Sequence, residues 1–202
     1  MSYGNSIEII PEAQFLNFLG QFLIADKPDR QMVEGIATIS RHVDIPEFLE
    51  LSEIAEKILK DEKMWKRFEN IHNHHFLIPA GCAIPLFSSQ LYFSRIKPDF
   101  YNNYLHSLGL NFKQEGRKFP DHIGNELILL SIILSMAVTD NSKSVAKLGR
   151  EMLRKFFIPH LDPISMRISN CDCDDPVNLY KPLFKCIKIL YEEAKDILAK
   201  IN

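Results

Sequence analysis

The sequence predicts an all-α fold in a single domain, and three observations indicate it. Apolar residues recur at helical spacing along most of the chain, no stretch alternates as a half-buried strand does, and the 11 prolines mostly stand between the apolar-periodic runs. The 202 residues suit one domain with one large core, and 46% apolar and 25% charged residues are an ordinary globular balance. We therefore expect one helical bundle over residues 1–202.

Four helices are expected at the start of the chain. Pro11 suits the first turn of the first helix, and the Asp-Lys-Pro segment at residues 26–28 ends it. The second helix has an apolar face between Met32 and Val43, and the third begins near Pro46. The fourth ends near residue 75 and carries the apolar residues Met64, Trp65, Phe68 and Ile71.

The pattern changes between Phe76 and Phe93, where no long helix can pass Pro79 and Pro85. We expect a structured apolar loop there, and loops of this kind often carry function. A short helix is expected after Pro98, before Gly109 ends it.

The most apolar helix is expected from about residue 120 to 138, with Pro120 at its start. Apolar residues cover nearly all its sides, which is typical of a helix at the centre of a bundle. One more helix is expected from Val145 to Phe156, followed by a loop containing Pro159 and Pro163, and then a last helix. The longest apolar run, residues 127–138, is too short to span a bilayer, so no stable membrane insertion is expected.

The charge balance argues against a nucleic-acid partner. The chain has 24 basic and 26 acidic residues and a net charge of −2, whereas nucleic-acid binding needs a clustered excess of Lys and Arg. The N-terminal residues do not resemble a secretory signal, so we expect a cytoplasmic protein. In that compartment the four cysteines are expected to be reduced thiols.

The most informative segment is residues 119–127, Phe-Pro-Asp-His-Ile-Gly-Asn-Glu-Leu. Asp121 is expected in the first helical turn, where a carboxylate near free N–H groups contributes roughly 0.3–1 kcal/mol. His122 and Glu126 are four residues apart, so they share a helix face and can pair. Gly124 allows another backbone to approach closely. From spacing alone, a well-capped core helix is the simpler interpretation of this segment.

Residues 120–127, Pro-Asp-His-Ile-Gly-Asn-Glu-Leu, resemble the signature of the TorD/DmsD/NarJ family of redox-enzyme maturation chaperones. That signature runs Pro-Asp-His, an apolar residue, two variable positions and then Glu-Leu, and every defining position matches. Residues 105–110 and 78–94 also resemble the family, although the aromatic residue Tyr92 stands one position later than in its members. The resemblance implies about ten helices over nearly the whole chain.

The resemblance also implies a function. Members bind the twin-arginine signal peptide of a molybdoenzyme and assist the apo-form of its catalytic subunit. Binding requires no chemistry, so we expect no catalytic residues and no cofactor in this chain. Such a peptide has a basic end and an apolar segment, so its receptor needs an apolar groove with carboxylates at one end. We expect that peptide site to be formed by Phe87, Tyr92, Phe93, Tyr104, Glu115, Asp121, His122 and Glu126.

Two other functions and the oligomeric state remain open from the sequence. A NarJ-like assembly factor for a non-exported molybdoenzyme subunit fits equally well, and both a monomer and a domain-swapped dimer are compatible with a helical protein of this kind. A helical metal-binding protein or metalloenzyme would use the histidines at 72–75, or Cys171 and Cys173 with Cys186 or His160.

The sequence supports both metal-site hypotheses only weakly. Two histidines do not complete a zinc site, and a lone C-x-C pair lacks its matching second pair. We expect partly exposed histidines at a helix end, and an acidic loop in which Asp174 or Asp175 caps the last helix.

Overall fold

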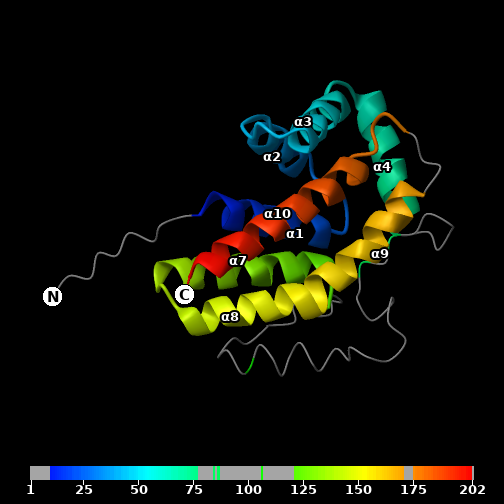
Figure 1. The fold of residues 1–202 in the computed structure, drawn as a ribbon. Coiled ribbons are helices and arrows are strands. Elements are labelled where there is room, and N and C mark those ends of the chain that lie inside the picture. Colours follow the sequence, from blue (N-terminus) through cyan, green and yellow to red (C-terminus); the bar gives the residue numbers. More distant parts are fainter. Residues whose placement is uncertain are drawn as a thin grey trace.

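The computed structural model describes residues 10–76, 84, 86, 106, 121–170 and 175–201. All regular structure in these ranges is helical, and they contain no strand (Figure 1). The predicted all-α class is therefore confirmed for this part of the chain. The ten helices that the resemblance implied stay a prediction, because part of the chain lies outside these ranges.

The four N-terminal helices follow in the predicted order. Pro11 and Pro46 occupy the first turns of α1 and α3, as expected from their preset φ angles. The Asp29 carboxylate caps the second helix by accepting a hydrogen bond of 2.7 Å from the Gln31 N–H group. The helices are α1 (Pro11–Ile24), α2 (Arg30–Arg41), α3 (Pro46–Leu59) and α4 (Glu62–Phe76).

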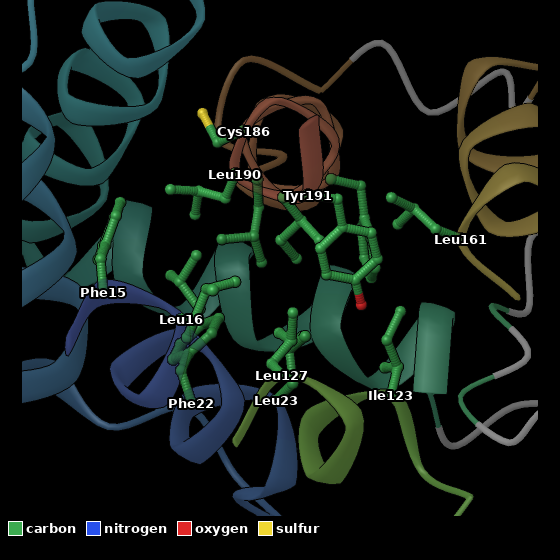
Figure 2. Packing of buried hydrophobic residues seen from close by; sticks show 14 of the residues in the cluster. Phe15, Leu16, Phe22, Leu23, Ile123, Leu127, Leu161, Cys186, Leu190 and Tyr191 are labelled. Carbon is green, nitrogen blue, oxygen red and sulfur yellow. The ribbon is translucent and has the colours of Figure 1, made fainter. Parts of the chain in front are cut away.

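The predicted central helix is α7 (Ile123–Thr139), and most of its residues are buried. In Figure 2, side chains of α1 and α7 point toward α10 (Tyr180–Lys200), which contributes Leu190 and Tyr191. One continuous cluster of buried apolar side chains takes members from every described helix, which is the arrangement of a single core. Burying a leucine such as Leu127 in that core contributes about 1.5–3 kcal/mol.

The crossing of α1 and α7 is unusually close because it joins two glycines. A Cβ atom on Gly20 would lie 2.6 Å from the Gly124 carbonyl oxygen, and a Cβ atom on Gly124 would lie 2.6 Å from the Gly20 oxygen. No real Cβ contact is that short, so both positions require glycine at this separation of the helices. The close backbone approach predicted at Gly124 is confirmed, and α1 is the partner.

The predicted loop around Pro159 and Pro163 is wrong. The chain runs as one continuous helical segment through α8 (Lys143–Met152), the π-helix η1 (Leu153–Phe157) and α9 (Ile158–Ser169) (Figure 1). Pro159 is the second residue of α9, where the hydrogen-bond register changes from π to α and a missing N–H group is tolerated. Pro163 lies inside α9, which buries Leu161, Ile164 and Ile168.

The last helix, α10, begins at Tyr180, later than the apolar pattern suggested. The Asn178 side chain accepts a hydrogen bond of 3.3 Å from the Tyr180 N–H group. Asp175, one of the two expected caps, instead accepts from the Val177 N–H group at 3.0 Å and pairs with Arg67 of α4 at 2.6 Å. Asp175 therefore ties the segment before α10 to α4. The other expected cap, Asp174, lies outside the described residues.

None of the described helices combines the length and apolarity that crossing a membrane requires.

Candidate functional site

The 120–127 motif lies at the N-terminal end of the central helix, and its polar side chains are enclosed. Asp121 and Glu126 are 0% exposed, and His122 is 1% exposed. Helix α7 begins at Ile123, three residues after the predicted start at Pro120. Asp121 therefore precedes the helix, and the first-turn position expected for its carboxylate is wrong.

His122 is the residue that caps α7. Its backbone is extended, with φ −73° and ψ 133°, and its side chain accepts a hydrogen bond from the Gly124 N–H group at 3.1 Å. The accepting atom is Nδ1. An extended residue whose side chain binds the N–H group two positions ahead is the geometry of an N-cap. The start of α7 is thus held by an imidazole, which the sequence pattern did not predict.

Glu126 contacts a histidine that is distant in the sequence. Its Oε2 atom lies 2.8 Å from Nδ1 of His160, and both side chains are fully buried. His160 belongs to α9 and lies three residues beyond η1. The pair therefore joins the motif helix to α9, whereas spacing had suggested His122 as the partner of Glu126. The sequence offered no local signal for this pair, because 34 residues separate its members.

Tyr191 of α10 is a third buried polar residue near Glu126, whose charge acts on its hydroxyl group. Its hydroxyl group is buried and has no hydrogen-bond partner in the described part of the chain. Burial raises the pKa of this hydroxyl well above its ordinary value, and the negative charge of Glu126 raises it further. Figure 2 shows the tyrosine pointing from α10 toward α7.

Two residues of the predicted apolar loop form backbone hydrogen bonds, one with the end of α4 and one with the start of α7. The Ile84 N–H group donates to the His75 carbonyl of α4 at 2.8 Å, and the Leu86 carbonyl accepts from the Ile123 N–H group at 2.8 Å. The Ile123 N–H group is one of the four that a helix leaves without an intrahelical partner. Ile84 is 5% exposed and belongs to the core. The loop and the motif thus meet at the first turn of α7.

The remaining predicted site residues are Phe87, Tyr92, Phe93, Tyr104 and Glu115. All five lie outside the described residues, so the expected groove and its aromatic wall stay predictions. Of the eight predicted residues, the structure brings together Asp121, His122 and Glu126 at the start of one helix.

The histidines at the end of α4 are buried, so the expectation of partly exposed side chains is wrong for two of them. His72 is 7% and His75 is 0% exposed. Nδ1 of His72 lies 2.6 Å from the Tyr180 hydroxyl of α10, and the ring centroid of Phe76 lies 4.7 Å from that of Tyr180. Because α10 covers this end of α4, the histidines pack in an aromatic core.

The described residues offer no group of three or more side chains that could hold a metal ion. Cys186 is fully buried, and its pKa is raised to about 12 by burial and by the nearby Glu47 and Glu50 carboxylates. The other two candidate thiols, Cys171 and Cys173, lie outside the described ranges.

No protein-family model, no curated protein and no solved structure matches the chain.

Proposed function

We propose that the protein is a cytoplasmic chaperone of the TorD/DmsD/NarJ type, which binds the twin-arginine signal peptide of a molybdoenzyme before export. The observation that carries the proposal is the Pro-Asp-His-Ile-Gly-Asn-Glu-Leu segment at residues 120–127. It opens the most buried of the described helices, and the apolar loop meets it there through the bond from Ile123 to Leu86. Signature and loop are the two elements that the resemblance associates with the peptide site.

The burial of the motif separates two roles within that site. Asp121, His122 and Glu126 are enclosed, so we assign them to holding the first turn of α7 and the adjoining loop in position. Direct contact with the peptide is assigned to the loop and the following segment. In this arrangement Glu115 receives the arginines, and the apolar part of the peptide packs against Phe87, Tyr92, Phe93 and Tyr104.

The chemistry of the peptide suits this division. Arginine forms strong bidentate hydrogen bonds with carboxylates, whereas lysine acts as a point charge. A receptor whose carboxylates bind two arginines should therefore have a higher affinity for them than for two lysines. The apolar segment of the peptide adds affinity by burial without adding that discrimination.

The test is a calorimetric titration of the full chain with a twin-arginine signal peptide and with the same peptide carrying two lysines. We expect saturable binding of the first and at least tenfold weaker binding of the second. Glu115→Gln should remove most of that preference, and Glu53→Gln, an exposed carboxylate of α3, is the matched control. Equal affinity for both peptides, or no binding of either, would contradict the proposal.

A client enzyme with its signal peptide deleted separates this function from that of an assembly factor for a non-exported subunit. Retained binding of the deleted client favours the assembly factor. Loss of binding favours the signal-peptide chaperone.

A further inference from the structure

Residues 143–155, in α8 and the start of η1, carry five cations and one anion. The cations are Lys143, Lys147, Arg150, Arg154 and Lys155, and the anion is Glu151. The chain as a whole has a net charge of −2, so this excess of positive charge is local. A local field of one sign attracts a partner of the other sign even when the net charge of the protein does not.

Four of these cations form a single row along the helix. Lys143, Lys147, Arg150 and Arg154 stand at positions i, i+4, i+7 and i+11, which share one helix face. Its α-helical part, from Lys143 to Arg150, extends about 10 Å at the rise of an α-helix, and Arg154 follows in η1. The opposite side of the same helix is buried in the core through Ala146, Gly149 and Met152. We call these four residues the basic ridge.

The basic ridge lies on a helix that is packed against its neighbours. Arg150 is partly buried and donates a hydrogen bond to the carbonyl group of Leu198, near the C-terminal end of α10. Helix α8 approaches α7 closely, since a Cβ atom on Gly149 would lie 2.8 Å from Cγ2 of Ile133. The other three cations therefore project from a rigid, packed element rather than from a loop.

Three cations of the ridge are not neutralised within the described part of the chain. Lys143, Lys147 and Arg154 are exposed and have no carboxylate partner there. Like charges at this spacing destabilise a helix. Elsewhere many cations pair with a carboxylate of this chain, as do Arg30, Arg41, Arg67, Lys185, Lys188 and Lys195.

We propose that the basic ridge binds an acidic helical segment of a partner protein. Because the four cations lie in one row along a helix face, they match a second helix that carries carboxylates at the same i, i+4, i+7 and i+11 positions. Arg154 adds bidentate recognition of carboxylates to the point charges of the lysines. This surface is separate from the motif at residues 120–127, and the inference does not depend on the proposed peptide site.

The side chains beside the basic ridge argue against a membrane surface as its partner. The next positions around the helix toward solvent are Ser144, Glu151 and Lys155, which are all polar. Attachment to a membrane surface uses apolar side chains that insert beside the cations. Nucleic acid is disfavoured because four cations in one narrow row make few phosphate contacts, and affinity for a phosphate backbone grows with their number.

The test uses the full chain and a labelled synthetic helical peptide with glutamates at i, i+4, i+7 and i+11, followed by fluorescence anisotropy. The variant K143E/K147E/R154E should weaken binding at least tenfold. K57E/K60E/K63E, which changes three exposed cations between the last turn of α3 and the first turn of α4 by the same charge, should weaken it less than threefold. The neutral variant K143Q/K147Q/R154Q should fall between them, and circular dichroism checks that all three fold.

Equal losses in the two charge-reversal variants would overturn the proposal, because net charge alone would then explain binding. It would also be overturned if the ridge bound vesicles of phosphatidylcholine with phosphatidylserine, or duplex RNA, and not the acidic peptide.

Discussion

Glu126 and His160 contact each other at 2.8 Å in a fully buried space between α7 and α9. The contact joins the N-terminal part of α7, which the motif opens, to the N-terminal part of α9, which follows the π-helix η1. Removing one member of such a buried pair leaves the other without compensation and typically costs about 3–5 kcal/mol. The pair therefore connects the motif to the stability of the whole bundle.

The first prediction concerns this pair. His160→Ala should lower the free energy of unfolding by about 3 kcal/mol, because the Glu126 carboxylate stays buried without its partner. Chemical denaturation with urea measures the change. Breaking the half-exposed pair Lys185–Glu50 by Glu50→Ala should cost only about 0.2–1 kcal/mol. If both variants lose the same small amount, the buried pair does not stabilise the fold.

The second prediction concerns the glycine crossing of α1 and α7. Gly124→Ala should destabilise the protein by about 1–3 kcal/mol, because the added methyl group meets the Gly20 carbonyl and forces two backbones apart. At Gly149 the nearest atoms are the side-chain ends of Leu198 and Ile133, which can shift. Gly149→Ala should therefore cost less, and thermal unfolding of the two variants compares them directly. A neutral Gly124→Ala would mean that the helices are not held at this separation.

The third prediction concerns the cap of α7. His122→Ala should cost about 0.5–2 kcal/mol, because the Gly124 N–H group loses its side-chain acceptor. His122→Asn keeps a short acceptor and should recover most of that loss. Urea denaturation of both variants measures the difference. Identical stabilities would show that the imidazole fills space and does not cap the helix.

The sequence predicted the features that depend on neighbouring residues. Pro11 and Pro46 mark helix starts because proline acts on its own backbone, and Gly124 marks a close approach because it lacks a side chain. Contacts that depend on tertiary packing could not be read in this way. His160 meets Glu126 only because α9 lies beside α7, and the apolar pattern did not specify that placement.

The incorrect predictions have the same physical origin. Pro159 was expected in a loop, but the change from π to α register at η1 accommodates its missing N–H group. His72 and His75 were expected near solvent, but Tyr180 of α10 covers the end of α4. Each outcome was set by a segment far away in the sequence.

The fourth prediction concerns pH. Burial raises the pKa of the Cys186 thiol to about 12 in the folded state, against 9.0 for the solvent-exposed thiol of an unfolded chain. Above pH 9 the unfolded state therefore binds fewer protons than the folded state. The contribution of the Cys186 thiol to the free energy of unfolding falls as the pH rises from 9 toward 12. Urea midpoints between pH 8 and pH 11 should fall less steeply for Cys186→Ala than for the natural chain. Parallel pH profiles would contradict this account of the thiol.

The most direct test of the account is a nuclear magnetic resonance titration that follows backbone amides while a twin-arginine signal peptide is added. The account places the guest against the loop that meets α7, so the amide signals of Ile84, Leu86 and Ile123 should shift and saturate together. The amides of Lys143 and Lys147 on the basic ridge should stay unchanged. Saturable binding that leaves Ile123 unaffected, or that shifts only the ridge, would contradict the central claim.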